Sequence, residues 1–382
     1  MKRYALLTAV LLLTVGALNA QTVTTFAGPG IIIDDAIIKA TDGTIFGSSY
    51  NGTFVYRVST SGEVSEYMGG INAANGLAFD SDSNLVVAAN LGNKIFKVMP
   101  DSTKIEFVPN IISPSGIIAD PLSDTLYVTQ YTQNRVVKIA PDGSITPFLV
   151  GNGLNGPVGM AWDENDTLYI ANYNDGRVFK VIDSTFTEIA DIPGNNFGAV
   201  GFLAYGAGKL YATGIGVHRV YQIALPSGSV SVLAGTGIGS VLDGPASEAR
   251  FNRPNGILFD PTDNSIYTSG FQSRAIRHIT GVITGISLES EVGIIEDYWL
   301  DQNYPNPFNP STTIRFRLPN ADAVSLKLYN ISGQEIATLL QEDLSAGEHR
   351  LTFDADNLAS GVYVYRIEAG AFSATKKMAL VR

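Results

Sequence analysis

Hydrophobic and polar positions alternate in short runs along most of the chain, a pattern that predicts β-strands. The runs are rich in β-branched and aromatic residues, and Asp, Asn, Gly and Pro separate them, as in strands joined by turns. No stretch of useful length shows the apolar period of a helix. We therefore expect an all-β protein.

The pattern repeats itself at intervals of about forty residues through most of the chain. Six units of four short strands can be aligned, from the diverged "IDDAIIKATDGTIFGSSY" to "PNGILFDPTDNSIYTSG". One small residue near the start of each first strand anchors the alignment: Ala36, Gly76, Gly116, Gly159, Gly201 and Gly256. Repeats of this length and content are typical of a β-propeller, so we predict six blades closed into a ring. The anchors are expected near the crowded axis, where a side chain would obstruct the backbone or a turn would require positive φ.

Two segments compete for the strand that closes the ring. "QTVTTFAGPG" at Gln21–Gly30 is similar to the unit-ending "GSVSVLAGTG" at Gly228–Gly237, which predicts that Thr22–Ala27 completes the last blade. "GVITGIS" at Gly281–Ser287 can itself provide the outer strand of the sixth blade. The sequence leaves both alternatives open.

A second set of strands follows the repeats. Pro305, Pro307 and Pro310 each fix φ and lack a backbone donor, so they predict an extended edge or loop outside any ladder. Period-two alternation then returns for about eighty residues, which predicts a small immunoglobulin-like β-sandwich. The expected division is a propeller over residues 21–288, a linker over 289–301 and a sandwich over 302–382.

Residues 1–20 have the plan of a cleavable signal peptide. Lys2 and Arg3 precede an apolar run that ends in small residues, and the run is short for a membrane span. Without these two of the 25 basic residues, 23 remain against 36 acidic ones, a formal charge of −13. Such a chain repels nucleic acid, and we see no basic stripe that would overcome this repulsion. We expect a monomer without a transmembrane segment in the mature chain. The absence of Cys excludes disulfides and thiol chemistry.

Two kinds of charged residue recur in the repeats. An Asp ends the first strand of four units and begins a tight turn, which its side chain is expected to stabilise by bonding the turn's own backbone: Asp80, Asp120, Asp163 and Asp260. A cation precedes the third strand of four units, and we expect it to pair with a neighbouring turn carboxylate and not to surround an anionic ligand: Lys94, Arg135, Arg177 and Arg219.

The repeats resemble the NHL-type propellers over about residues 22–288, most specifically in "LAGTGIGSVLDGPASEARFNRPNGILFD" at Leu233–Asp260. Similar six-bladed rings include the gluconolactonase- and regucalcin-like (SMP-30-like) hydrolases and the virginiamycin B lyase-like proteins. The resemblance implies that a ligand would lie at the mouth of the central channel. The lactonase-like enzymes further imply a divalent metal, such as Ca²⁺, held by Glu, Asn and Asp around that mouth.

The match to that metal site is incomplete. Asp34 and Asp35 stand in place of the Glu. Three Asn residues precede anchors of inner strands: Asn75, Asn155 and Asn255. No acid stands at the corresponding position of a later unit. These five are our candidate binding residues, with Asp35, Asn75 and Asn255 as candidate metal ligands. His218, His278 and His349 are scattered, and no nucleophile elbow, phosphate loop or dinucleotide fingerprint is present. We predict no catalytic residue and no certain cofactor.

Residues Asn303 to Arg382 resemble the C-terminal sorting domain of the type IX (Por) secretion system. The ordered motifs are "NYPNPFNPSTTIRFRLP", "LKLYNISGQEI", "LASGVYVYRI" and "KKMALVR". The family's motif positions are occupied by Tyr304, Pro305, Asn306, Pro307, Phe308, Gly333, Gly361, Tyr363, Lys376 and Lys377. The resemblance implies a bacterium of the Bacteroidetes kind, passage through the periplasm, and delivery to the cell surface or medium by that machinery.

Two functions remain. The first is an exported, non-catalytic propeller that binds a protein or glycan partner through its loop-rich face. The alternative is a secreted metal-dependent lactonase-like hydrolase or lyase acting at the channel mouth.

Overall fold

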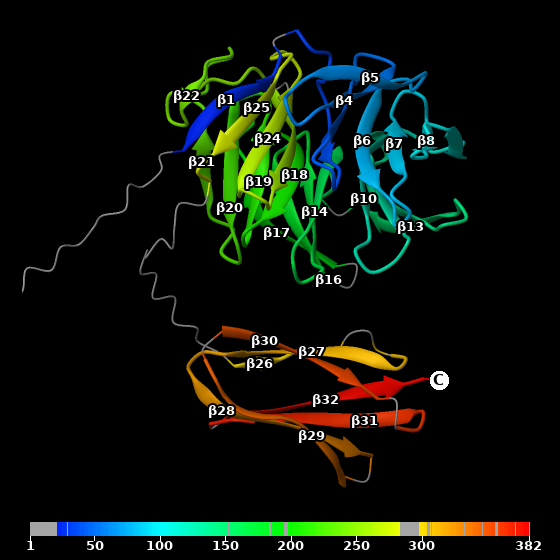
Figure 1. Ribbon diagram of the computed structural model, residues 1–382, viewed down its shortest axis with the longest axis vertical. Coiled ribbons are helices and arrows are strands. Elements are labelled where there is room, and N and C mark those ends of the chain that lie inside the picture. Colours follow the sequence, from blue (N-terminus) through cyan, green and yellow to red (C-terminus); the bar gives the residue numbers. More distant parts are fainter. Residues whose placement is uncertain are drawn as a thin grey trace, which may run out of the picture. The chain divides into compact units, whose positions relative to one another are not determined.

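The structure is a computed structural model that describes residues 21–282 and 298–381, except for residues 29, 152, 183–184, 195–197, 304–305, 307, 332, 346, 356–357 and 371. These residues form two compact units, divided after residue 285 (Figure 1). Both consist of strands, and the only helical element among the described residues is a single 3₁₀ turn, η1 (Tyr131–Gln133). The all-β prediction is confirmed.

The first unit is a ring of six antiparallel sheets, numbered here as blades 1 to 6, each running from the axis to the rim in chain order. Blade 1 consists of β2 (Ile37–Lys39), β3 (Ile45–Ser48), β4 (Phe54–Val58) and β5 (Val64–Gly69). Blade 2 consists of β6 (Ala74–Phe79), β7 (Leu85–Ala89), β8 (Lys94–Val98) and β9 (Lys104–Val108). Blade 3 consists of β10 (Pro114–Ala119), β11 (Leu126–Gln130), β12 (Arg135–Ile139) and β13 (Ile145–Val150). Blade 4 consists of β14 (Pro157–Trp162), β15 (Leu168–Asn172), β16 (Arg177–Ile182) and β17 (Thr185–Asp191). Blade 5 consists of β18 (Val200–Gly206), β19 (Lys209–Gly214), β20 (Arg219–Ala224) and β21 (Val230–Ala234).

Blade 6 joins the two ends of the ring. Its first three strands are β23 (Pro254–Asp260), β24 (Ser265–Gly270) and β25 (Ile276–Thr280), and its fourth is β1 (Thr22–Ala27) from the start of the described chain. Val23 pairs with Ile279, and the two-residue β22 (Gly244–Pro245) pairs with the outer side of β1. The first closure alternative is therefore confirmed. In the rival segment, Gly281 and Val282 form no strand and Ile283–Ser287 lie outside the described residues.

Apolar side chains hold neighbouring blades together. The described residues form six buried clusters in this unit, one between each pair of neighbouring blades. The cluster between blades 6 and 1 includes Ile45 and Val58 from one blade and Leu258 and Ile276 from the other. Second strands such as β7 and β15 lie between two neighbours and are buried throughout, whereas outer strands such as β13 are largely exposed. Burial thus accounts for the ring, because no blade covers both of its own faces.

The glycine anchors allow blades to approach each other closely. A Cβ on Gly116 of blade 3 would lie 1.9 Å from the carbonyl oxygen of Val158 in blade 4. A Cβ on Gly256 of blade 6 would lie 2.2 Å from the carbonyl oxygen of Asp35 in blade 1. Neither glycine has a positive φ, so crowding is the reason for both and the alternative of a strained turn is wrong here.

The repeated Asp residues stabilise the turns as predicted. Asp80 accepts hydrogen bonds from the backbone nitrogens of Asp82 and Asn84, and Asp163 accepts them from Asn165 and Thr167. The corresponding bonds of Asp120 and Asp260 come from Leu122 and Thr262.

The expectation for the repeated cations holds only for Arg177, which pairs with Asp175 at 2.7 Å. Lys94 pairs with Glu106 of β9, while Arg135 donates to Gln130 and Arg219 to the carbonyl of Thr236. The carboxylate prediction is therefore wrong for Arg135 and Arg219. The chain supplies a neutral oxygen at the place where a turn carboxylate was expected.

The second unit is a sandwich of two antiparallel sheets. One sheet has the order β26–β27–β30 and the other β29–β28–β31–β32. Their bounds are β26 (Trp299–Leu300), β27 (Ser311–Leu318), β28 (Asp322–Asn330), β29 (Glu335–Leu344), β30 (Gly347–Asp354), β31 (Gly361–Ala369) and β32 (Phe372–Leu380). Alternate residues of β27 and β28, among them Phe316 and Leu326, fill one core with Ile367 of β31. The predicted sandwich is confirmed.

The Pro- and Asn-rich segment before β27 covers part of the free edge of β32. The Asn306 side chain bonds to Ala379 and Lys377, and the Phe308 backbone exchanges two hydrogen bonds with Ala379 and Val381. The Phe308 ring is buried in the sandwich core. A short bridge to β32 therefore replaces the fully unladdered segment that the prolines predicted, because Phe308 lies between them and keeps its N–H.

The other motif residues have ordinary structural places. Gly333 takes φ +82° in the β28–β29 turn, Gly361 begins β31, and the Tyr363 hydroxyl donates to the carbonyl of Ala359 at 2.8 Å. Lys376 and Lys377 are exposed on β32. The remaining three lie outside the described residues: Tyr304, Pro305 and Pro307.

Candidate binding site at the channel mouth

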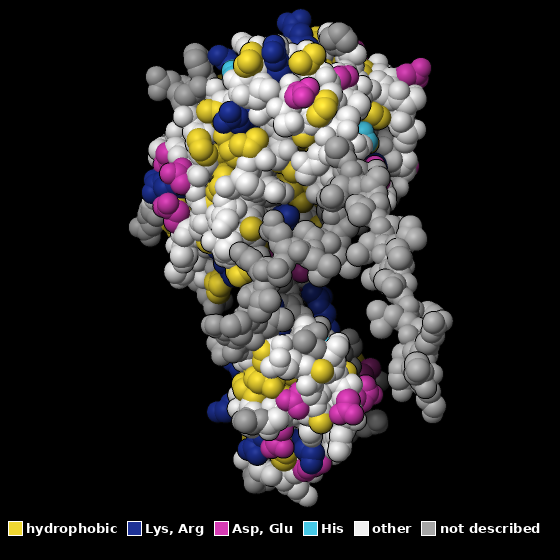
Figure 2. Space-filling view, turned by 90° about the vertical axis from the view of Figure 1, so that its left-hand side faces the viewer, with side chains coloured by type: hydrophobic (Ala, Val, Ile, Leu, Met, Phe, Trp, Pro, Cys, Tyr) yellow, Lys and Arg dark blue, Asp and Glu magenta, His cyan; other side chains and the backbone are white. Residues whose placement is uncertain are grey.

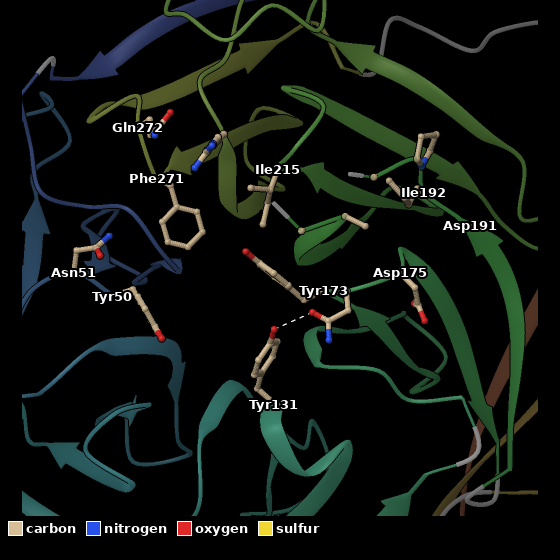
Figure 3. Close-up of a pocket in the computed structure, with 16 residues that line it drawn as sticks. Tyr50, Asn51, Tyr131, Tyr173, Asp175, Asp191, Ile192, Ile215, Phe271 and Gln272 are labelled. Carbon is tan, nitrogen blue, oxygen red and sulfur yellow. Dashed lines mark hydrogen bonds between the residues drawn. The ribbon is translucent and has the colours of Figure 1, made fainter. Parts of the chain in front are cut away.

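Five blades carry an apolar or aromatic residue at the position where the chain leaves the second strand. These residues follow β3, β11, β15, β19 and β24 at the same end of the ring: Tyr50, Tyr131, Tyr173, Ile215 and Phe271. All five line a cavity of about 850 Å³ at the mouth of the central channel (Figure 3). Blade 2 has Asn90 at this position, since its backbone nitrogen donates to the carbonyl of Ala73 as that of Tyr131 donates to Ser113. The next residue, Leu91, is 58% exposed and lines neither cavity described here.

The four aromatic rings form two pairs. Tyr50 and Phe271, from blades 1 and 6, meet edge to face with ring centroids 6.5 Å apart. Tyr131 and Tyr173, from blades 3 and 4, do the same at 5.8 Å. Because blades 6 and 1 lie opposite blades 3 and 4 in a six-membered ring, the pairs are two aromatic walls that face each other across the axis.

Polar side chains complete the mouth. Amides and charged groups line the cavity beside the rings, among them Asn51, Asn174, Gln272, Arg253 and Asp191. Burial raises the pKa of Tyr50 and of Tyr173, so both hydroxyl groups remain protonated at neutral pH. The cavity therefore offers flat apolar surfaces next to hydrogen-bonding groups of both kinds.

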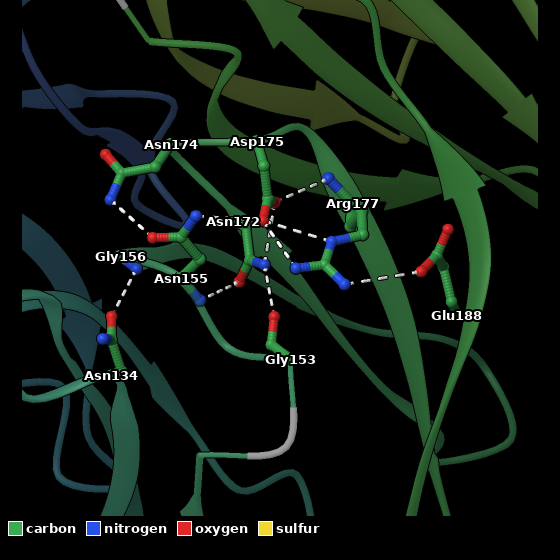
Figure 4. A network of polar contacts seen from close by, with 9 residues as sticks. All are labelled: Asn134, Gly153, Asn155, Gly156, Asn172, Asn174, Asp175, Arg177 and Glu188. Carbon is green, nitrogen blue, oxygen red and sulfur yellow. Dashed lines mark hydrogen bonds and ion pairs between the residues drawn. The ribbon is translucent and has the colours of Figure 1, made fainter.

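A polar network fixes the loop that carries Tyr173 (Figure 4). Asp175 accepts hydrogen bonds from the side chains of Asn172, Asn155 and Arg177 at 2.9, 3.1 and 2.7 Å. Burial alone would raise the pKa of Asp175, but these three donors outweigh it and hold that pKa below its ordinary value. Asp175 is thus an ionised centre of the network.

The network also reaches the neighbouring blade. The Tyr131 hydroxyl donates to Asn174 Oδ1 at 2.8 Å, and Asn174 Nδ2 donates to Asn155 Oδ1 at 3.0 Å. Asn155 is one of the candidate binding residues, but its amide takes part in these hydrogen bonds and it lines neither cavity. It supports the aromatic wall and does not present its side chain to a ligand.

A narrower cavity, called here the neck, continues the mouth toward the axis. It measures about 170 Å³ and shares all four aromatic residues with the mouth. Polar residues from four blades line the rest of the neck, together with Val158 of blade 4: Asp35, Asn75, Asn90, Ser115 and Asn255. Three candidates from the sequence, Asp35, Asn75 and Asn255, therefore converge here although they lie in blades 1, 2 and 6.

Two oxygen atoms in the neck have no hydrogen-bond partner. Asn255 Nδ2 donates to Asp35 Oδ1 at 2.7 Å and to the carbonyl of Asp34 at 3.1 Å. Asp35 Oδ2 and Asn75 Oδ1 are buried and receive no donor from the described residues. Burial, and next the neighbouring carboxyl of Asp34, raise the pKa of Asp35 well above its ordinary value.

Asp34 serves the wall and not the neck. Its carboxylate accepts hydrogen bonds from the Tyr50 backbone nitrogen at 2.7 Å and from Asn51 Nδ2 at 2.8 Å. Burial raises the pKa of Asp34 despite these bonds. Like Asn155, it fixes a loop that carries an aromatic ring.

The candidate metal set provides few free oxygen ligands. Asn255 turns its NH₂ group toward Asp35, which leaves Asp35 Oδ2 and Asn75 Oδ1 as unengaged oxygens, whereas Ca²⁺ takes about six to eight. No group of three or more His, Cys, Asp or Glu side chains that could hold a metal occurs among the described residues. The side chains as they stand do not fit a Ca²⁺ ion held by protein ligands alone.

The four aromatic residues were not among the candidates from the sequence. Their signal was present, because each occupies the same column of the repeat, one or two residues after the second strand. The column does not by itself indicate a site, since an aromatic residue next to a strand is ordinarily taken as core.

The described residues show no sign of a membrane span in helical form, and one face of the molecule shows how its charges are distributed. No helix among the described residues is long and apolar enough to cross a bilayer. On the described part of the face in Figure 2, acidic and basic side chains are interspersed without a continuous basic stripe.

The sequence matches one family model, the secretion system C-terminal sorting domain, over residues 302–381. No curated protein matches the chain in sequence.

Many solved structures resemble the propeller. An auxiliary nutrient binding protein from Bacteroides thetaiotaomicron is 16% identical with a TM-score of 0.59, over 68% of this chain and 76% of that one. A gluconolactonase from Xanthomonas campestris is 15% identical with a TM-score of 0.53, over 69% and 90%. A virginiamycin B lyase from Staphylococcus aureus is 18% identical with a TM-score of 0.51, over 68% and 98%.

At these identities the likeness shows the fold, and it confirms the predicted similarity to lactonase- and lyase-type rings. The match at residues 302–381 adds the route of export. The chain thus combines a six-bladed β-propeller with a secretion system C-terminal sorting domain, which marks it for the type IX secretion machinery as a secreted or cell-surface protein.

Proposed function

We propose that the propeller is a non-catalytic binding module for a glycan, carried to the cell surface or medium by its sorting domain. The observation that supports this most is the pair of aromatic walls at the channel mouth. A sugar ring has apolar C–H faces and hydroxyl edges, so it can lie against aromatic rings while its edges meet amides and carboxyls. One similar structure carries the name of an auxiliary nutrient binding protein, in keeping with this role. A bacterial host of the Bacteroidetes kind and inner-membrane passage by residues 1–20 belong to the same proposal.

The test is binding of the chain from residue 21 onward to a glycan array, followed by titration of the best glycan. Tyr131→Ala and Tyr173→Ala should each weaken binding by about tenfold or more, because each removes a stacking surface. Leu91→Ala is the control, since Leu91 is an exposed apolar residue that follows β7 at the same end of the ring but lines neither cavity. Thermal melting would verify that each variant is folded. Absence of any glycan binding, or full binding by both tyrosine variants, would contradict the proposal.

A lactonase-like hydrolase or lyase is the second candidate. The two unpaired oxygens on the channel axis favour it, since they could take part in holding a metal together with water and substrate. Metal analysis of the purified protein separates the candidates. Stoichiometric Ca²⁺, Zn²⁺ or Mn²⁺ that is lost in Asp35→Ala would support the enzyme and count against the binding module.

A further inference from the structure

Two of the three amide side chains in the neck are in contrasting states. Asn90, only 6% exposed, donates through Nδ2 to Ser113 Oγ, the carbonyl of Pro114 and Ser115 Oγ at 3.3, 3.1 and 2.9 Å. Asn75, 7% exposed, lines the same neck, and its Oδ1 has no partner. The chain therefore supplies partners for the NH₂ group of Asn90 and leaves the oxygen of Asn75 without one.

An unpaired buried oxygen lowers the stability of a folded protein, because water bonded it in the unfolded chain. Two of them, Asp35 Oδ2 and Asn75 Oδ1, lie in one small cavity beneath the aromatic walls. Groups of this kind are found at functional sites, where a ligand supplies the missing partner. The floor of the neck is therefore incomplete without a bound group.

We propose that Asp35 and Asn75 form the floor of the glycan site and bind two hydroxyl groups on one edge of a sugar ring that stands between the aromatic walls. A hydroxyl group both donates and accepts, so it can pair with a carboxamide oxygen and with a carboxyl oxygen. This inference rests on the proposed function and adds to it the part of the sugar that enters the neck.

The neck favours a neutral hydroxyl over a cation. A metal ion would find two buried oxygens without a partner, Asp35 Oδ2 and Asn75 Oδ1, whereas Ca²⁺ takes about six to eight oxygen ligands. An ammonium group would place a charge pair in a small buried cavity at a desolvation cost. The volume of about 170 Å³ admits several groups of the size of water and so the edge of one ring.

Thermal unfolding of two matched variants tests whether the unpaired amide is retained for a ligand. Asn75→Leu removes a buried oxygen that has no partner, so its Tm should equal or exceed that of the wild type. Asn90→Leu removes three hydrogen bonds in the same neck, so its Tm should fall by several degrees. A Tm loss in Asn75→Leu as large as that in Asn90→Leu would assign Asn75 a structural role and overturn the inference.

Saturation-transfer NMR with D-glucose, D-galactose and D-mannose tests the ligand chemistry, with their 2-amino derivatives as the cationic counterparts. At least one neutral hexose should contact the wild type, and Asn75→Leu should weaken that contact at least about tenfold. Contact by none of the three, stronger contact by every amino derivative, or equal contact in Asn75→Leu would each overturn the inference. Glycan-array binding that requires Tyr131 but is unchanged in Asn75→Leu would remove the floor subsite alone and leave the proposed function standing.

Discussion

At the scale of single residues, the site depends on polar side chains that hold aromatic rings in place. Asp34 fixes the loop of Tyr50, and Asp175 fixes the loop of Tyr173. Neither carboxyl needs to touch a ligand to affect binding. Substitution of either carboxyl should therefore change the position of an aromatic ring by releasing the loop that carries it.

Asp175 gives a prediction for pH dependence. A carboxyl whose pKa is lowered in the folded state contributes stability above its ordinary pKa of 3.8, and that stability is lost as the pH falls through the lower folded value. Asp175→Asn should thus lower the free energy of unfolding by about 1 kcal/mol at pH 7 and by much less below pH 3.8. Urea unfolding at several pH values measures this. A difference that does not change with pH would show that the charge of Asp175 has no part in it.

Sequence patterns predicted residue roles where the cause is local. The Asp turns are confirmed because the acceptor and its donors lie within four residues of each other, as in Asp163 and Thr167. The partner of Arg135 was not predictable in the same way. Its guanidinium donates to Gln130 on the neighbouring strand, and which acceptor lies within reach depends on the folded arrangement of the strands. Asp35 and Asn75 were named as candidates, but their lack of partners depends on neighbours from other blades.

At the scale of elements, the long insertion before β23 clasps the closing strand. Asp243 accepts hydrogen bonds from the backbone and hydroxyl of Thr25 in β1 at 3.0 and 2.9 Å. It also pairs with the guanidinium of Arg277 at 2.7 Å, which is 1% exposed and donates to the carbonyls of Arg250 and Leu242. The insertion thus ties β25 to β1 from outside the ladder.

We expect Asp243→Ala to loosen this closure. The substitution removes the three bonds from Thr25 and Arg277, which should cost about 1–3 kcal/mol and raise hydrogen–deuterium exchange in Thr22–Ala27 above that of the other outer strands. Asp101→Ala is a suitable control, because Asp101 is an exposed carboxylate that bonds only its own turn at Thr103. Equal exchange in the two variants would argue against the clasp.

Elements were predictable in proportion to their length and period. The strands of six blades and six strands of the sandwich follow from alternation, whereas β22 and β26 have two residues each and exist only through their partners. The closing strand was open between two alternatives because two segments of the sequence could each provide an outer strand, and neither pattern states which of them pairs with the third strand. Its pairing with β25 is a fact of the folded ring.

At the scale of the whole molecule, the ring and the sandwich each have their own core. The ring distributes its apolar contacts over six interfaces of the same kind, so closure completes the burial of the first and last blades. The architecture could be predicted from the sequence because the same four-stranded pattern occurs six times along the chain.

Export should depend on the second unit. In a bacterium with a type IX secretion system, removal of residues 302–382 should leave the protein in the periplasm, because the matched sorting domain is then absent. Cell fractionation and immunoblotting measure this, with the full chain as the control. Release of the shortened chain at an undiminished level would show that another segment directs it.

The two aromatic pairs give a sixfold ring a mouth of lower symmetry. Asn90 and Ile215 occupy this repeat position in blades 2 and 5, at opposite points of the circle, so a flat ligand has two equivalent orientations about the axis where six aromatic residues would give it six. An aromatic residue in place of Ile215 would change the preferred orientation without altering any strand. A single column of the repeat thus sets how a ligand is oriented in the ring.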